Sequence, residues 1–245
     1  MESSTLIVGA MDSEIDYLVS KLENCNKSKL DNYSVYEGKI GEKYIIILKT
    51  DIGIINAAIA TTLTIQKYAP KCIINIGTAG GYGNDIHKQD IVIGKRCMNI
   101  MSAKTPKAEI GEGSNSTKWE YVTFQKGEDK KTLECGNDEL IQVISKEKYN
   151  KGNVYVGTIG SGDIWCREKD RIEFLQNKHN VLCEDMEAVS IYTVANKYEI
   201  PVVAVKIISN NEYLGEEYDR NVATNLQEHI YNILEKWEGK VTKWK

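Results

Sequence analysis

Short apolar runs rich in β-branched residues alternate with amphipathic stretches along this chain, and the alternation restricts the folds that it can adopt. The apolar runs predict buried strands over residues 5–10, 72–77, 90–94, 154–159, 181–183 and 201–208. Stretches with helical spacing lie between them, as in the segment that carries Ile15, Leu18, Val19 and Leu22. Continuous apolar strands are typical of sheets covered by helices on both faces. We therefore predict an α/β fold of three layers, with a central mixed, twisted sheet flanked by helices.

The remaining elements complete this map. Residues 33–39 and 44–48 predict a hairpin, and helices are predicted over residues 55–68, 137–145, 167–178, from Glu187 through Lys197 and up to Trp237. No Pro-, Gly- and Ser-rich linker and no internal repeat divides the chain, so we interpret residues 1–245 as a single domain. Residues 98–131 form a divergent polar excursion, in which we predict one strand at Glu120–Phe124.

Composition excludes several classes of protein. The chain has 245 residues, 42% of them hydrophobic, which suits one large domain. A formal net charge of −4 provides no basic excess for a nucleic-acid partner. The longest apolar run, residues 44–48, is too short to cross a bilayer, so we expect no membrane partner and a cytoplasmic protein.

Cysteine and histidine usage argues against a metal or a disulfide framework. The six cysteines are scattered without a CxxC pair, which favours free thiols in a reducing compartment. The three histidines have no metal-ligand spacing. No Walker loop and no GxGxxG is present, so we expect no nucleotide cofactor.

Small and polar residues collect at four predicted strand ends, where α/β sheets build ligand sites. These segments are residues 9–14, 77–81, 161–165, and 184–187 together with 209–210. Each one alone has an ordinary structural explanation. The glycine-rich segment 77–81 reads first as a tight strand-to-helix turn, and Glu14 as a carboxylate in a first helical turn.

Taken in order, these segments resemble the nucleoside phosphorylase/nucleosidase superfamily, and most closely its 5′-methylthioadenosine/S-adenosylhomocysteine nucleosidases. Residues 9–14 (GAMDSE) resemble the opening GAMxxE of that family, and residues 74–81 (INIGTAGG) are similar to its glycine-rich loop. The other matching segments are residues 50–58, 157–163, 185–188 (DMEA, against EMEA) and 201–209. The resemblance covers nearly the whole chain.

The resemblance implies roles on the sugar side of a nucleoside site. Glu14 matches the carboxylate that activates an attacking water, which is chemistry that a positioned glutamate can perform. Glu187 matches the residue that binds the ribose hydroxyls, with Met186 packed against the sugar. The loop that lines the sugar contributes Thr78, Ala79 and Gly80. The bond to be broken is then the N-glycosidic one.

On the base side the chain departs from the family. Trp165 matches an aromatic residue that stacks on the purine, and the backbone of Cys166 would address the base edge. Ser209 is present, but Asn210 stands where adenine-specific nucleosidases have the aspartic acid that protonates N7 of the leaving base. Asparagine cannot supply a proton. The two nearby carboxyl groups that would take over this step are Asp163 and Glu212.

Three interpretations of Asn210 remain open. In the first interpretation, the base specificity of the enzyme is shifted towards 6-oxopurine nucleosides, because an amide can donate to O6 and accept from a protonated N7. Alternatively, it is a slow adenine nucleosidase, or a catalytically inactive relative that binds or stores nucleosides. The sequence leaves the 5′ substituent of the nucleoside open as well.

Hydrolysis is preferred over phosphorolysis. Phosphorylases of the superfamily gather arginines around phosphate, one of them just before the glycine-rich loop, where this chain has Ile76. The four arginines at 96, 167, 171 and 220 lie outside the loops concerned. The expected protein is a purine nucleoside N-ribohydrolase whose partner is a small-molecule nucleoside. The resemblance to the family also implies a homodimer.

Overall fold

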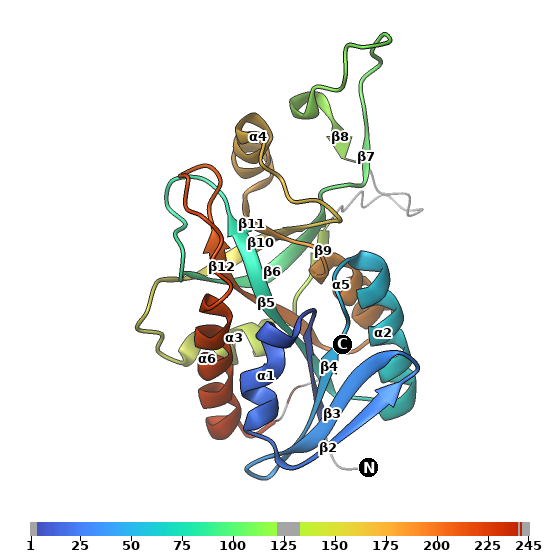
Figure 1. The fold of residues 1–245 in the computed structure, drawn as a ribbon, viewed down its shortest axis with the longest axis vertical. Coiled ribbons are helices and arrows are strands. Elements are labelled where there is room, and N and C mark those ends of the chain that lie inside the picture. Colours follow the sequence, from blue (N-terminus) through green and yellow to red (C-terminus); the bar gives the residue numbers. More distant parts are fainter. Residues whose placement is uncertain (1–3, 122–132, 240, 242–245) are drawn as a thin grey trace.

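The apolar runs pair into one mixed sheet in the computed structural model, which describes residues 4–121, 133–239 and 241 (Figure 1). The strands lie side by side in the order β11-β10-β6-β12-β5-β1-β4-β3-β2, and β9 pairs with residues 96–98 of β6. Their bounds are β1 Ser4–Gly9, β2 Glu23–Leu30, β3 Tyr33–Ile40, β4 Lys43–Lys49, β5 Cys72–Gly81, β6 Ile91–Asn99, β9 Leu133–Cys135, β10 Val154–Ser161, β11 Val181–Asp185 and β12 Val202–Asn210.

One additional pairing curls half of the sheet into a ring. β11 runs parallel to β10 and also antiparallel to the end of β5, where Cys183 pairs with Gly81 and Glu184 with Gly80. On the other side of β5, Asn210 of β12 also pairs with Gly80. The ends of β11, β5 and β12 therefore meet at Gly80.

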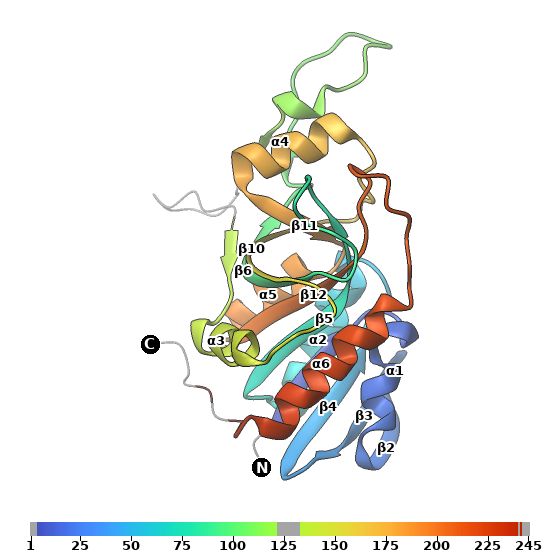
Figure 2. The same cartoon turned by 90° about the vertical axis from the view of Figure 1, so that its left-hand side faces the viewer.

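Helices cover both faces of the sheet (Figures 1 and 2). The helices are α1 Asp12–Ser20, α2 Ile54–Tyr68, α3 Asp138–Lys146, α4 Lys169–His179, α5 Ala188–Lys197 and α6 Val222–Lys236. Buried side chains of α1, α3 and α6 form one core cluster with the sheet, and those of α2 and α5 form another on the opposite face. α4 packs in a third, smaller cluster beside the ring. The predicted three-layer α/β fold is confirmed.

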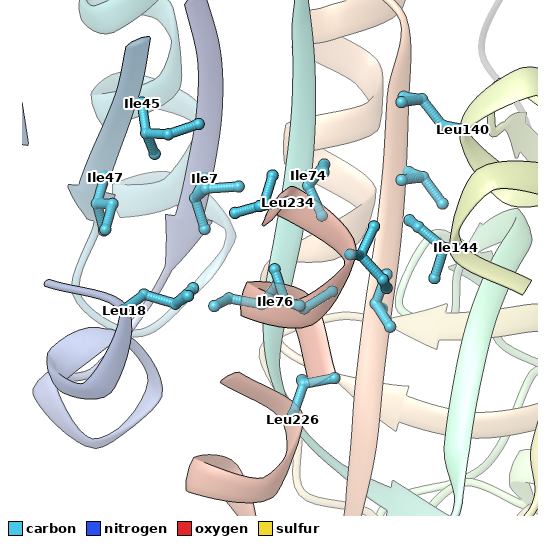
Figure 3. Packing of buried hydrophobic residues seen from close by; sticks show 14 of the residues in the cluster. Ile7, Leu18, Ile45, Ile47, Ile74, Ile76, Leu140, Ile144, Leu226 and Leu234 are labelled. Carbon is cyan, nitrogen blue, oxygen red and sulfur yellow. The ribbon is translucent and has the colours of Figure 1, made fainter. Parts of the chain in front are cut away.

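Alternation along the strands explains why each face is apolar. Successive strand residues point to opposite faces, and Ile45 and Ile47 of β4 lie in the first cluster while Ile46 and Leu48 lie in the second. Figure 3 shows Ile7, Ile45 and Ile47 packed opposite Leu18 of α1 in the first cluster. All of these side chains are fully buried. Burial on both faces therefore produces the continuous apolar runs seen in the sequence.

Two predictions at the strand level were wrong. β2 was missed because it is an edge strand whose residues are mostly exposed and polar, so it carries no apolar signal. The glycine-rich segment 77–81 is not a strand-to-helix turn, since β5 continues through it to Gly81. Small residues occur there because β11 and β12 both approach that part of β5.

The polar excursion extends away from the sheet, beyond α4 (Figures 1 and 2). Its described part contains the short strands β7 Ala103–Lys104 and β8 Glu120–Tyr121, which pair with each other, and the 3-10 turn Ser116–Lys118. The predicted strand Glu120–Phe124 begins as β8, but residues 122–124 lie outside the described residues. No helix within the described ranges has the length and apolarity to cross a membrane.

Candidate active site

A pocket of about 240 Å³ opens where the ends of β1, β5, β11 and β12 meet. Its wall contains nearly all of the site residues expected from the sequence, although they are separated by up to two hundred positions in the chain. The lining residues are Ala10, Met11, Glu14, Ile52, Thr78, Ala79, Gly80, Ile164, Trp165, Glu184, Asp185, Met186, Glu187, Ser209, Asn210 and Tyr218.

Glu14 is a buried carboxylate held in one orientation by four donors. It lies in the first turn of α1, and only 4% of its surface is exposed. Its Oε2 accepts hydrogen bonds from the backbone N–H groups of Ala10 (2.9 Å) and Met11 (3.2 Å). Its Oε1 accepts from the N–H of Thr78 (2.8 Å) and from the Thr78 hydroxyl (3.0 Å). These bonds tie the end of β1 to the glycine-rich end of β5.

The approach of Glu14 to β5 depends on Gly77. A Cβ atom at this position would lie 2.8 Å from Glu14 Oε1, closer than non-bonded atoms tolerate. The glycine therefore leaves room for the carboxylate, which is a packing reason for a small residue just before Thr78.

Glu187 lies at the N-terminus of α5 and is also nearly buried, with 7% exposure. Its Oε1 accepts a hydrogen bond from the N–H of Gly53 at 2.9 Å. Burial and the neighbouring Asp185 carboxylate raise the pKa of Glu187 to about 8. Met186, the preceding residue, lines the same pocket.

A buried ion pair that the sequence did not reveal supports Glu187. Lys206 Nζ of β12 lies 2.7 Å from Asp185 Oδ2 at the end of β11, and both side chains are 1% exposed. Asp185 also accepts from the N–H of Ala188, at the start of α5. Burial lowers the pKa of Lys206, but the carboxylates of Asp185, Glu187 and Glu14 outweigh it, and the pKa rises above its usual value. The site therefore contains a permanent cation beneath its acidic groups.

Trp165 forms the outer wall of the pocket. Its side chain is 52% exposed, and its Nε1 donates to Glu212 Oε1 at 3.1 Å. Its ring meets the ring of Tyr218 edge to face, with 5.6 Å between the centroids. The sequence predicted a solvated surface loop over residues 212–218 and no site role for Tyr218, because an exposed aromatic residue in a polar loop has no local signature. An exposed aromatic wall of this kind is suited to stacking a planar base.

Ser209 and Asn210 end β12 on the opposite side of the pocket. The Ser209 hydroxyl lies 3.0 Å from Asn210 Oδ1. Asn210 Nδ2 approaches Glu212 Oε1 at 3.4 Å, a long and weak hydrogen bond. The amide donor of Asn210 is thus available to a ligand.

Cys166 lies behind the pocket wall rather than in it. Its backbone N–H donates to Glu184 Oε1 at 2.7 Å, and Glu184 Oε2 accepts from the Tyr82 hydroxyl at 2.6 Å. Glu184 lines the pocket and is 6% exposed. Burial raises the pKa of Glu184 to about 7. The sequence placed Glu184 in the segment 184–187 after the predicted strand 181–183 but gave it no role of its own, because no residue of the family motif matches it.

The two carboxyl groups that were considered as substitutes for the missing acid have other partners. Asp163 Oδ1 accepts from the N–H of Ile54 at the start of α2, and Asp163 is not part of the pocket wall. Glu212 is paired with Arg167 and bonded to Trp165. Within residues 4–121 and 133–239, no cluster of three or more Asp, Glu, His or Cys side chains is arranged to hold a metal ion.

Known proteins are similar to this chain in sequence and in fold. The 5′-methylthioadenosine/S-adenosylhomocysteine nucleosidase of Halalkalibacterium halodurans is 32% identical over 206 residues, 83% of this chain and 84% of the relative. The nucleosidase of the same name from Oceanobacillus iheyensis is 28% identical over 94% of this chain and 98% of its own. The crystal structure of the Neisseria meningitidis nucleosidase in complex with methylthio-immucillin-A superposes with a TM-score of 0.79, at 22% identity, over 96% of this chain and all of that one.

A family model covers almost the entire described chain. The model of the phosphorylase superfamily matches residues 4–236, which span β1 to α6 and include every pocket residue. Given this match and the 32% identity to a nucleosidase of similar length, the chain belongs to the phosphorylase superfamily.

Proposed function

We propose that this protein is a purine nucleoside N-ribohydrolase, which releases a base by attack of water on C1′ of the ribose. The observation that carries this proposal is the placement of Glu14 and Glu187 in one pocket, opposite an aromatic wall at Trp165. The relatives that align with the chain over most of its length are named as nucleosidases. Their substrates, 5′-methylthioadenosine and S-adenosylhomocysteine, are the first candidates here.

Glu14 is proposed to bind and deprotonate the attacking water. Its carboxylate is fixed by backbone donors on one side, while the Thr78 hydroxyl on the other side is a rotor. Rotation of that hydroxyl frees a lone pair of Oε1 for a water molecule without disturbing the backbone bonds. The base is therefore positioned before the substrate arrives, which lowers the cost of reaching the transition state.

Glu187 is proposed to bind the ribose hydroxyls, with Met186 and the backbone of Ala79 and Gly80 against the sugar. The transition state for N-glycosidic cleavage resembles an oxocarbenium ion, so positive charge develops on the ribose. Negative charge on Glu187 stabilises that developing charge in a buried site, where electrostatic interactions are strong. Hydroxyl donors favour the ionised form of Glu187, which burial and the Asp185 carboxylate disfavour.

Water is favoured over phosphate as the nucleophile. The pocket wall within the described chain contains no Arg or Lys, and the buried Lys206 is occupied by Asp185. A phosphate dianion beside Glu14 and Glu187 would have no cation of the described pocket wall to offset the repulsion, because Lys206 is already paired with Asp185. This supports hydrolysis rather than phosphorolysis.

The assembly is proposed to be a cytoplasmic homodimer. Ile52, Ile55 and Ile59 lie at helical spacing around the start of α2 and are each about half exposed or more. Such a stripe of apolar side chains is typical of a protein–protein contact. All six cysteines are free thiols, which suits a reducing compartment.

The function is tested by chromatography of released bases. The purified protein would be incubated with methylthioadenosine, S-adenosylhomocysteine, adenosine, inosine and guanosine, each with and without phosphate. We expect catalytic release of a purine from at least one nucleoside without phosphate. Release that requires phosphate would make the protein a phosphorylase, and no release from any substrate would make it a binding protein.

A further inference from the structure

Gln227 of α6 is a buried amide that bonds to the helix carrying Glu14. Its side chain is 1% exposed, although the other buried residues of α6 are mostly apolar. α1 and α6 pack side by side on the same face of the sheet (Figure 2). The Oε1 atom of Gln227 accepts from the N–H groups of Tyr17 (3.0 Å) and Leu18 (3.3 Å). Its Nε2 donates to the carbonyl of Ser13 at 2.8 Å. One side chain of α6 therefore holds three backbone groups of α1.

These bonds lie on the turn of α1 that carries Glu14. Ser13 immediately precedes Glu14, and Tyr17 follows it within one turn. In a regular helix the Tyr17 N–H bonds to the Ser13 carbonyl, and here the amide of Gln227 bonds to both groups. Its Nε2 also donates to the Ala223 carbonyl of α6 at 3.2 Å. The reversed amide would place its nitrogen against two N–H groups, so only one orientation satisfies all four partners.

The position of Glu14 therefore has two determinants. Donors from the ends of β1 and β5 fix its carboxylate end. Gln227 fixes its backbone end, in a helix of only nine residues. A helix of that length is marginal by itself, so its placement depends on tertiary contacts. The register of α1 against α6 then helps to decide where the carboxylate lies.

The backbone of α1 does not need the amide in order to be satisfied. With an apolar side chain at position 227, Ser13 and Tyr17 would still bond to each other within the helix. Apolar contact is non-directional, whereas the hydrogen bonds from Gln227 to α1 demand a defined distance and angle. The amide therefore contributes a fixed placement of this turn, which an apolar residue of the same size would not supply.

We propose that Gln227 is a positioning residue, which holds the first turn of α1 so that the Glu14 carboxylate is aligned with the attacking water. This inference rests on the proposed nucleosidase function and adds a residue of α6 to it. Gln227 is not part of the pocket wall, and its hydrogen-bond partners all lie in α1 and α6. Its removal should therefore slow the chemical step and leave nucleoside binding intact.

The variant Gln227→Met removes the amide and keeps a side chain of similar length. Single-turnover release of the base would be measured beside calorimetric binding of the nucleoside, and the rate expressed per binding site. We expect the rate to fall by about 10–100-fold, because a displacement of about 1 Å at a reacting group can cost about a hundredfold. The dissociation constant of the nucleoside should stay within about threefold of the wild-type value.

A double-mutant cycle with Glu14→Gln shows whether Gln227 acts through Glu14. Without the base there is no alignment to lose, so adding Gln227→Met should lower the residual rate of Glu14→Gln by less than about twofold. An equal loss in both backgrounds would mean that the amide supports the pocket in general, and would overturn the positioning role. A wild-type rate in folded Gln227→Met would overturn it as well. Both results leave the nucleosidase function standing.

The variant Ile233→Ala is the control for a general weakening of α6. Ile233 is buried in the same helix, but it lines a surface depression with Val143 and Lys146 of α3. Its truncation should lower the stability of the protein and leave the rate per binding site at the wild-type level. A rate loss as large as that of Gln227→Met would show that any loosening of α6 slows the reaction, which would remove the specific role of Gln227.

A direct readout of Glu14 decides the proposal if the protein turns over no nucleoside and the proposed function fails. The NMR signal of the Glu14 carboxyl carbon would be compared between the wild type and Gln227→Met, with Glu14→Gln identifying the signal. A shifted signal supports the placement of Glu14 by Gln227, and an identical signal overturns it. If Gln227→Met does not fold, Gln227→Asn, whose amide is one methylene shorter, takes its place in all of these measurements.

Discussion

At the scale of single residues, Glu14 and Glu187 have different hydrogen-bond partners in the pocket. Replacing them should therefore have different effects. Glu14 is surrounded by four donors, so its position is fixed by the protein. Glu187 accepts one bond, from Gly53, and its remaining lone pairs are open to a ligand. The first arrangement suits a base that must be aligned with a water molecule, and the second suits a group that grips a substrate.

Replacing Glu14 by glutamine should abolish turnover and leave nucleoside binding within a few-fold. The amide keeps the shape and one acceptor but cannot take a proton, and general-base catalysis contributes about 10²–10⁴ in rate. The measurement is single-turnover base release beside calorimetric binding of a nucleoside. Turnover at the wild-type rate would remove Glu14 as the base.

Replacing Glu187 by glutamine should raise KM about tenfold or more, because a hydrogen bond to a charged group contributes roughly 1.5–3 kcal/mol. The loss should be confined to ligands that have ribose hydroxyls. Binding of the nucleoside would therefore be compared with binding of its 2′,3′-dideoxy form, in the wild type and the variant. An equal loss for both ligands would contradict the ribose-binding role.

At the scale of elements, the ion pair between Lys206 of β12 and Asp185 of β11 fixes the ring of strands around the site. Replacing Lys206 by methionine leaves Asp185 buried without its partner, and removal of one member of such a pair typically costs about 3–5 kcal/mol. Urea unfolding should show a loss of this size. Lys197→Met, at an exposed position of α5, should change stability by less than about 0.5 kcal/mol.

The double variant Asp185→Asn with Lys206→Met tests the cause of that loss. Removing both charges should recover part of the stability, because the penalty comes from the unpaired carboxylate. A double variant that is less stable than the single one would show that the ion pair itself, rather than the unpaired charge, carries the effect.

The elements that the sequence predicted are those whose residues carry an apolar pattern. β1, β4 and β12 are buried on both faces, and α2 and α6 have one apolar side, so the pattern of apolar residues in the sequence predicts them. β2 has no such pattern, because it lies at an exposed edge. The closure of β11 against β5 depends on pairing between distant segments, which no local window of sequence contains.

The same distinction holds for the site. Motif resemblance placed Glu14, Thr78, Trp165 and Asn210 in one site, and the fold brings them to one pocket. Their proposed chemical roles stay predictions. The place of Glu184 in the pocket wall required the structure, since only the fold shows that it accepts from the Cys166 N–H and lies near Asn210 beside Gly80.

At the scale of the whole molecule, the isoleucine stripe at α2 predicts the oligomeric state. A charge at Ile55, which is 69% exposed, should be tolerated by the folded monomer but not by an apolar contact. We expect Ile55→Glu to convert a dimer to a monomer in light scattering after gel filtration. Leu214→Glu, at an exposed position in the loop after β12, is the control and should remain dimeric. A monomeric wild-type protein would contradict the proposed assembly.

For the molecule as a whole, water aligned by Glu14 is the proposed nucleophile. The most direct test is a turnover experiment in water enriched in heavy oxygen, with phosphate present, followed by mass spectrometry of the sugar product. We expect a free ribose or 5′-substituted ribose that has gained one heavy oxygen atom at C1. A sugar phosphate without the heavy atom would contradict it, because phosphate would then have attacked C1′ in place of water.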